Sequence, residues 1–100
     1  MKYNQIESLV IQWADDKGIL EKGNPTAQCE KTKEEVEELY EAILLNDREE
    51  IADALGDIMV TVIIQAHMQG MSLMECLEGA YEIIRKREGK MINGTFVKNS

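Results

Sequence analysis

The sequence predicts an all-α protein: a four-helix, bundle-type domain with a short irregular C-terminal tail. Apolar residues recur at spacings of three and four, which is the period of an amphipathic helix. Helix-breaking residues are few, with one Pro and seven Gly in the chain. Because 100 residues fit one compact unit, we expect residues 1–100 to form a single domain.

The first half of the chain predicts two helices. The first is expected over about 3–17, with an apolar face made by Ile6, Leu9, Val10 and Trp13. Residues 18–25 contain two Gly and an Asn-Pro pair, so we expect a loop there. Thr26 is the expected N-cap of a second helix over about 27–45. Its main apolar stripe is Val36, Leu39, Tyr40 and Ile43.

The second half predicts two more helices and the tail. Each begins at a capping box, formed by Asp47 with Glu50 and by Ser72 with Glu75. The third helix is expected to end near Gln69, because Gly70 suits the position after a helix. The fourth is expected to end near Arg87. The tail contains Asn93-Gly94 and a short run of β-forming residues, and we expect an ordered turn or irregular segment.

Composition excludes several classes of protein. The net charge is −8 and the pI is about 4.6, which argues against binding a nucleic-acid backbone. The two cysteines, Cys29 and Cys76, belong to no CxxC or His/Cys cluster, so we expect free thiols in a reducing cytosol. The N-terminus lacks the apolar core of a signal peptide. The longest apolar run, 58–64, is too short to span a bilayer. We expect a cytoplasmic protein that does not bind a membrane.

Ten carboxylates lie between Glu34 and Asp57, with only Arg48 to offset them. Glu35 and Glu38 share one helix face, and Asp53 and Asp57 share another, with Glu50 one turn earlier. An acidic, solvated surface is the simpler interpretation. Two observations argue against this interpretation. Apolar residues follow Glu35 and Glu38 on the same side of their helix, and Asp57 directly precedes the apolar run IMVTVII. Buried carboxylates need partners, and a divalent cation such as Mg²⁺, with Mn²⁺ as a substitute, prefers oxygen ligands.

Positive charge gathers at the other end of the chain. Five of the eleven basic residues fall in the last sixteen positions: Arg85, Lys86, Arg87, Lys90 and Lys98. Compensation of a helix dipole accounts for the first three but not for Lys90 or Lys98. Basic groups together with a metal-loaded acidic cluster would suit a polyphosphate substrate.

Several of these motifs together resemble the MazG family of all-α nucleoside triphosphate pyrophosphohydrolases. They are Glu34-Glu35-x-x-Glu38, an acidic helix ending in Asp57, the stretches WADDKGIL and GKMINGTFVK, and Gln28 and Lys31. The resemblance implies a hydrolase that converts (d)NTP to (d)NMP and pyrophosphate by water attack at the α-phosphorus. It also implies a dimer or tetramer with sites beside the subunit interface, and we expect a homotetramer.

The resemblance also assigns roles to the carboxylates. Glu35, Glu38 and Asp57 would be metal ligands, and Glu34 a further ligand or the base that orients water. The family's ExxD motif fits two registers in this sequence. Glu50 to Asp53 matches the spacing literally, whereas alignment on the following apolar run selects Asp57 and leaves Ala54 where the family has Glu. We favour Asp53 and Asp57, with Glu50 third.

The remaining assignments concern the substrate and the competing functions. Pyrophosphate would be held by basic groups: Lys31, Arg87, Lys90 and Lys98. Trp13 is either a core residue or a platform for the base, and His67 is expected in the core or at an interface. A non-enzymatic acidic interaction or regulatory module is the alternative function. A metal buffer is a weaker one, because no EF-hand pattern is present.

Overall fold

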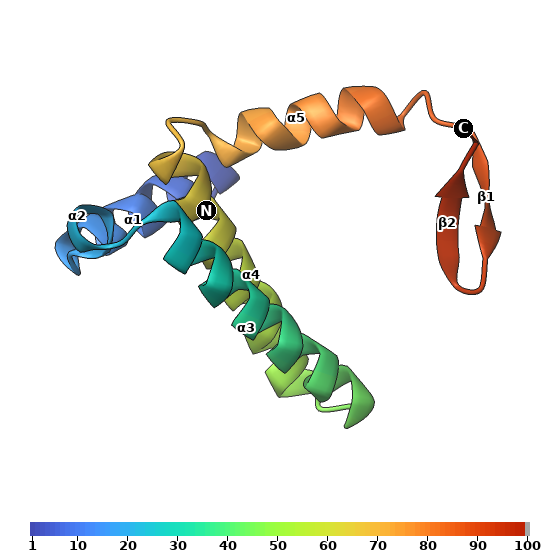
Figure 1. Ribbon diagram of the computed structural model, residues 1–100, viewed down its shortest axis with the longest axis horizontal. Coiled ribbons are helices and arrows are strands. Elements are labelled where there is room, and N and C mark those ends of the chain that lie inside the picture. Colours follow the sequence, from blue (N-terminus) through green and yellow to red (C-terminus); the bar gives the residue numbers. More distant parts are fainter. Residues whose placement is uncertain (100) are drawn as a thin grey trace.

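A computed structural model describes residues 1–99 of the chain. The described part is mostly helical, as predicted, and ends in a small antiparallel hairpin (Figure 1). The elements in chain order are α1 (Tyr3–Asp16), α2 (Ile19–Lys22), α3 (Pro25–Leu44), α4 (Arg48–Met68), α5 (Leu73–Ile84), β1 (Gly89–Ile92) and β2 (Thr95–Lys98).

The helical hairpin of α3 and α4 is the centre of the fold (Figure 1). Asp47 caps α4 as predicted, because its side chain accepts a hydrogen bond from the Glu50 backbone N–H. The two helices are also joined by partly buried polar groups. The Thr32 hydroxyl donates to the Thr61 hydroxyl at 2.9 Å, and the Gln28 amide donates to the Thr61 carbonyl at 3.1 Å. These bonds fix the position of α3 along α4, and α1 packs across α4.

The helix starts differ from the prediction in three places. Asn24, rather than Thr26, caps α3, and its side chain accepts a hydrogen bond from the Ala27 backbone N–H. The helix can begin at Pro25 because Pro has no backbone N–H that would need an acceptor there. The predicted loop contains the single-turn helix α2. The side chain of Ser72 does not cap α5 but donates to Glu7 at 3.2 Å, which ties the start of α5 to α1.

Of the two expectations for the tail, the irregular segment was wrong and the ordered turn was right, because residues 89–98 form a two-stranded hairpin. Asn93 and Gly94 both have positive φ, 50° and 81°, as a two-residue type I′ turn requires. Gly89 faces the opposite strand so closely that a Cβ there would meet the Val97 carbonyl. Each face of the hairpin carries apolar side chains, Met91 with Phe96 and Ile92 with Val97, and all four are exposed.

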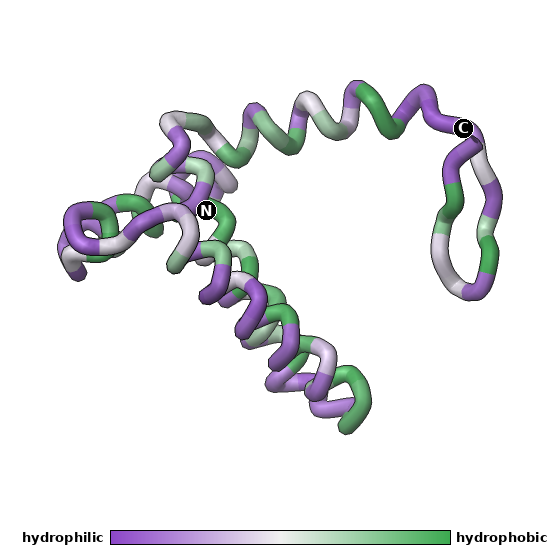
Figure 2. Tube along the Cα trace, in the orientation of Figure 1, coloured by the Kyte–Doolittle hydropathy of each residue, from purple (hydrophilic) through white to green (hydrophobic). Residues whose placement is uncertain are grey.

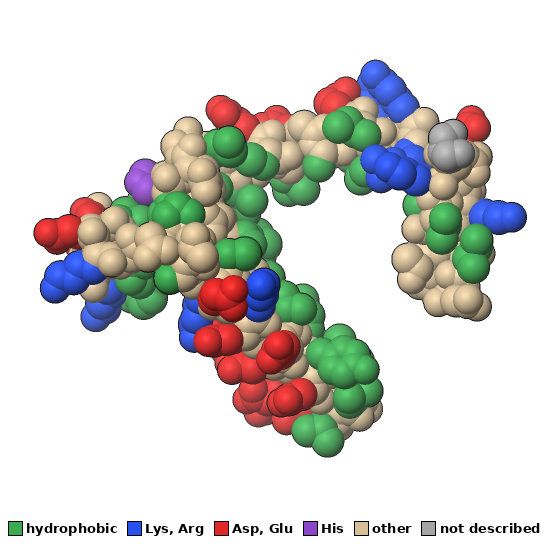
Figure 3. Space-filling model, viewed as in Figure 1, with side chains coloured by type: hydrophobic (Ala, Val, Ile, Leu, Met, Phe, Trp, Pro, Cys, Tyr) green, Lys and Arg blue, Asp and Glu red, His purple; other side chains and the backbone are tan. Residues whose placement is uncertain are grey.

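The predicted four-helix bundle is not closed within one chain. α5 leaves the end of α4 and carries the hairpin away from the other helices, so that the two limbs enclose an open space (Figures 1 and 3). The radius of gyration is 15.8 Å, against about 13 Å for a compact domain of this length. The predicted stripe of α3 is also largely uncovered, with Val36 48% and Tyr40 64% exposed. We refer to residues 73–99 as the arm.

By length and composition alone, α4 would also pass as a membrane-crossing helix. Core helices pass the same test, and α4 packs along α3 in this structure. It also carries four carboxylates, at Glu49, Glu50, Asp53 and Asp57. We therefore treat α4 as a packing helix.

Candidate functional site

Four of the predicted site residues form an acidic cluster on the α3–α4 hairpin: Glu35 and Glu38 on α3, and Asp53 and Asp57 on α4. The two antiparallel helices place them together. Thr32 of α3 contacts Thr61 of α4, so the turn of α3 that follows Thr32 lies opposite the turn of α4 that precedes Thr61. Glu35 is the buried member, with 6% of its surface exposed. Figure 3 shows the carboxylates gathered on this limb of the molecule.

The carboxylates of the cluster raise one another's pKa. A hydrogen bond to Glu35 and the negative charge of Glu35 raise the pKa of Glu38, and Asp57 adds to the effect. Burial raises the pKa of Asp57, and the charges of Asp53 and Glu35 raise it further. Both shifts show that the cluster contains more negative charge than its surroundings neutralise.

Lys31 supplies the positive charge that the cluster does have. Its ammonium lies 3.3 Å from Glu35 Oε1 and 3.5 Å from Glu34 Oε2. Accordingly, a hydrogen bond to Glu35 and its charge raise the pKa of Lys31. The lysine is more than half exposed, so its pairing with Glu35 leaves it free to move away when another cation arrives.

The buried carboxylate of Glu35 fits a metal ligand. Its second oxygen, Oε2, is buried and has no hydrogen-bond partner in the structure, an arrangement that is costly unless a cation or donor meets it. Within residues 1–99, no three acidic, His or Cys side chains already converge closely enough to hold a metal ion. Metal binding in the cluster therefore requires these side chains to turn toward one another. Their role as ligands stays a prediction.

Two other predicted acids stand apart. Glu34 is exposed, and its only polar contact within the described residues is Lys31. Glu50 is exposed in the first turn of α4, where its backbone N–H is bonded to Asp47. Glu50 lies two turns from Asp57 along α4, and the acids whose charges act on Asp57 are Asp53 and Glu35.

An apolar groove between α1 and α4 adjoins the cluster, and the sequence did not predict it. Trp13 and Asp57 line one part of it, of about 330 Å³, together with Leu9, Val10 and Val60. Asp53, Asp57 and Gly56 line the adjoining part. A Cβ on Gly56 would meet no atom within 4 Å, so its absence leaves the groove deeper. Trp13 is about half exposed, as are Ile6 and Leu9 on the same face of α1, and its role as a platform for the base stays a prediction.

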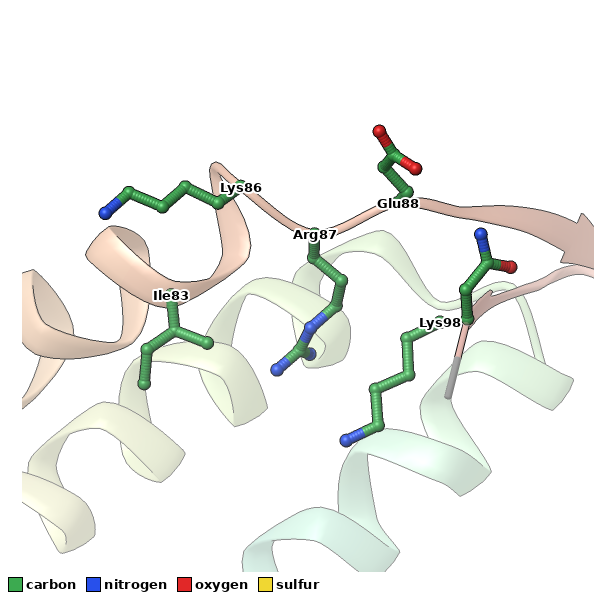
Figure 4. A pocket seen from close by; sticks show the side chains of 6 residues that line it. Ile83, Lys86, Arg87, Glu88 and Lys98 are labelled. Atoms are coloured by element: carbon green, nitrogen blue, oxygen red, sulfur yellow. The ribbon is translucent and has the colours of Figure 1, made fainter.

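Three of the four predicted basic residues, Arg87, Lys90 and Lys98, lie on the arm, far along the chain from the acids. Arg87 and Lys98 line one shallow pocket with Lys86 and Glu88. In Figure 4 the side chains of Arg87 and Lys98 point to the same side of the chain, whereas Glu88 points to the opposite side. Lys90 is paired with Val97 across the hairpin and does not line this pocket. His67 is exposed, so it is not a core residue of the single chain, and its place at an interface stays a prediction.

The comparison with protein families matches residues 24–92 to the MazG nucleotide pyrophosphohydrolase domain. This segment contains α3, α4, α5 and β1, and with them the acidic cluster. The mostly helical scaffold with its two acidic helices agrees with this family of nucleotide pyrophosphohydrolase domains. The chain belongs to the MazG family.

One curated relative is an uncharacterized 18.2 kDa protein from the rep-hol intergenic region of Haemophilus phage HP1. It is 34% identical over 62 residues, which cover 62% of this chain and 38% of the relative. The chain thus spans well under two thirds of that relative's length. No solved structure matches the chain.

Proposed function

We propose that the protein is a Mg²⁺-dependent nucleoside triphosphate pyrophosphohydrolase that converts (d)NTP to (d)NMP and pyrophosphate. Family membership implies nucleotide pyrophosphohydrolase activity in general. The observation that carries the finer proposal is the buried, unpartnered Oε2 of Glu35 within a cluster of four carboxylates. Such a cluster is short of positive charge. Mg²⁺, which binds oxygen ligands and accompanies nucleotide phosphates, would supply that charge.

Glu35, Glu38, Asp53 and Asp57 would hold the metal, and Mn²⁺ would substitute for Mg²⁺. Bound there, the metal would neutralise the triphosphate and activate water. Glu34 is an exposed acid directly before Glu35 on α3 and would orient the attacking water or accept its proton. Lys31 would leave Glu35 for a phosphate oxygen, because its side chain is more than half exposed.

The groove between α1 and α4 would hold the nucleoside. Its walls are mostly apolar, and Asp53 and Asp57 stand at its margin, so a base in the groove leaves the α-phosphate beside the acids. Trp13 would stack on the base. The cations of the arm, Arg87, Lys90 and Lys98, would neutralise the leaving pyrophosphate.

We also propose that the chain works in the cytoplasm as a homo-oligomer, with a tetramer built from two dimers as the expected form. The open bundle and the exposed apolar stripe of α3 support association. The negative net charge supports the proposal that neither nucleic acid nor membrane is a partner.

The test is pyrophosphate release from a panel of NTPs and dNTPs with and without Mg²⁺. We expect turnover that requires the metal, and a loss of about a hundredfold or more in Glu38→Gln. The matched control is Glu37→Gln, which removes a neighbouring exposed acid from another side of α3. A folded protein with no turnover on any nucleotide would refute the proposal and favour an acidic interaction module.

A further inference from the structure

We propose that Lys31 is the resident cation of the acidic cluster and that it exchanges with the divalent metal. Its ammonium pairs with Glu35 in the absence of metal and moves to the phosphates of the substrate when the metal binds. This inference rests on the proposed function and adds a form of regulation to it. The cluster would bind metal poorly until a triphosphate arrives, because the metal has to displace a cation that is already there.

Lys31 contacts the most deeply buried acid of the cluster. Its ammonium lies 3.3 Å from Glu35 Oε1, and the Glu35 side chain is 8% exposed. The carboxylate of Glu34 lies 3.5 Å from the same ammonium. Within residues 1–99, no other Lys or Arg forms an ion pair with an acid of the cluster. The ammonium therefore lies against the carboxylate that we propose as a metal ligand.

The charge of Lys31 also acts on acids of both helices. A hydrogen bond to Glu35 raises the pKa of Glu38, burial raises the pKa of Asp57, and the charge of Lys31 opposes both increases. One ammonium thus acts on three of the four acids of the cluster. These are the acids that would surround a metal, so Lys31 lies close to the place where the metal would bind.

The metal and the ammonium compete for Glu35. Lys31 holds Oε1 of this carboxylate, and Oε2 is buried without a hydrogen-bond partner. A divalent cation on the same carboxylate would lie a few Å from the ammonium, and like charges at that separation repel each other strongly at a protein surface. Binding of the metal therefore favours departure of Lys31.

Lys31 is able to leave the cluster. Hydrophilic residues recur along α3 (Figure 2), and the Lys31 side chain is 55% exposed. Its flexible stem can therefore place the ammonium in water or on a ligand. Glu35 is much less exposed than Lys31, so the acid stays in the cluster while the cation moves.

A triphosphate makes this departure easier. Loss of Lys31 leaves the buried charge of Glu35 without a partner, which is costly unless the metal replaces it. The ammonium in turn gains a new partner when a phosphate oxygen lies nearby. The triphosphate would thus favour binding of the metal, and the metal would favour binding of the triphosphate to the same extent, because such coupling is reciprocal.

The first test measures binding of Mn²⁺ alone to the nucleotide-free protein, by the electron paramagnetic resonance signal of free Mn²⁺. Lys31→Met keeps the length of the side chain and removes its charge. Exposed ion pairs shift an equilibrium constant by up to about fivefold, and Glu35 is buried, so we expect Lys31→Met to bind Mn²⁺ about threefold more tightly or better. The matched control, Lys33→Met, removes the same charge from an exposed pair with Glu30 at 3.2 Å and leaves the affinity unchanged.

A second variant keeps the charge at this position. The guanidinium of Lys31→Arg can form two parallel hydrogen bonds with a carboxylate, so this variant is expected to bind Mn²⁺ no more tightly than the wild type. Circular dichroism checks that each variant is folded. The exchange is overturned if Lys31→Met binds Mn²⁺ as weakly as the wild type or more weakly, if Lys33→Met gains as much, or if neither wild type nor Lys31→Met binds Mn²⁺.

The second test measures nucleotide turnover at saturating Mg²⁺. Lys31→Met is expected to lose about tenfold in kcat/KM, because a hydrogen bond between charged groups is lost at the phosphates. The variant would thus bind metal more tightly and use substrate less well, whereas a residue that only kept the cluster in shape would weaken both. An unchanged kcat/KM in Lys31→Met overturns the move of Lys31 to the phosphates.

The two measurements keep the two proposals apart. A wild type without turnover on any nucleotide refutes the proposed function, and the Mn²⁺ titration still decides whether Lys31 competes with the metal. A wild type with turnover, together with no gain in Mn²⁺ affinity in Lys31→Met, overturns the exchange and leaves the proposed function in place.

Discussion

Replacement of Asp57 by Asn tests whether this residue, rather than Glu50, completes the acidic cluster. In the metal-free protein the pKa of Asp57 is raised by burial and by the charges of Asp53 and Glu35. Removing its charge therefore relieves repulsion, and we expect the metal-free variant to be at least as stable as the wild type. The same change removes a ligand, so Mg²⁺ should no longer stabilise the fold.

The magnitude follows from ligand linkage. At a free Mg²⁺ concentration of 100 times its Kd, binding adds about 2.7 kcal/mol to the free energy of unfolding. One kcal/mol shifts Tm by about 4–8 °C in a domain of 60–100 residues, so the wild type should gain about 10–20 °C. Asp57→Asn should gain almost nothing.

The assay is thermal unfolding followed by circular dichroism, with and without Mg²⁺, at one fixed protein concentration because the chain is proposed to associate. Glu50→Gln serves as the matched comparison, because Glu50 is exposed and two turns away on the same helix. The reasoning is refuted if Asp57→Asn keeps the full metal-induced shift while Glu50→Gln loses it.

Two further predictions concern pH and the contact between α3 and α4. The raised pKa values of Glu38 and Asp57 mean that the metal-free folded state holds protons more tightly than the unfolded state. Their stabilising contribution is present below the ordinary values, 4.5 and 3.8, and is lost as pH rises through the raised ones. Relative to wild type, a variant with Glu38→Gln and Asp57→Asn should gain Tm as pH rises to 7; a constant difference would contradict the pKa shifts. Thr61→Val removes the hydroxyl that accepts from Thr32 and should cost about 1 kcal/mol in urea unfolding. Thr26→Val, at an exposed position of α3, should cost less, and an equal cost would contradict the role of the buried hydrogen bond.

Most of the helical fold was predictable from local patterns. The four long helices begin and end within a few residues of their predicted bounds, because apolar spacing and capping residues act over short distances. Asp47 and Gly70 take the predicted end positions. The hairpin was missed although Asn93-Gly94 between short β-forming runs is a strong hairpin pattern. Its strands have four residues each, too few for alternation to stand out.

The limits of the sequence are clearest on α3. Periodicity predicted the stripe of Val36 and Tyr40 correctly as apolar, but it does not say what covers a stripe, and in the single chain nothing does. The side of α3 that meets α4 is instead marked by Gln28, Thr32 and Glu35, whose polar side chains pattern analysis assigns to solvent. Their burial became visible only in three dimensions.

The candidate site was partly predictable. The pairing of Glu35 and Glu38 with Asp53 and Asp57 follows from helix geometry, once the two helices are known to be antiparallel. The apolar groove beside them was not predictable, because it depends on how α1 crosses α4. Neither was the burial of Glu35, since its neighbours on α4 lie about twenty residues away in the sequence.

The short turn between α3 and α4 has a consequence for the order of folding. Residues 45–47 are the whole connection between the two helices. The contacts between α3 and α4 therefore join residues that are close in sequence, and such local contacts form rapidly. This step takes place within one chain and is independent of protein concentration. Association of two chains, as proposed, is an encounter that depends on that concentration. A newly made chain would therefore form the α3–α4 hairpin, with its acids and Lys31 in place, before it meets a second chain.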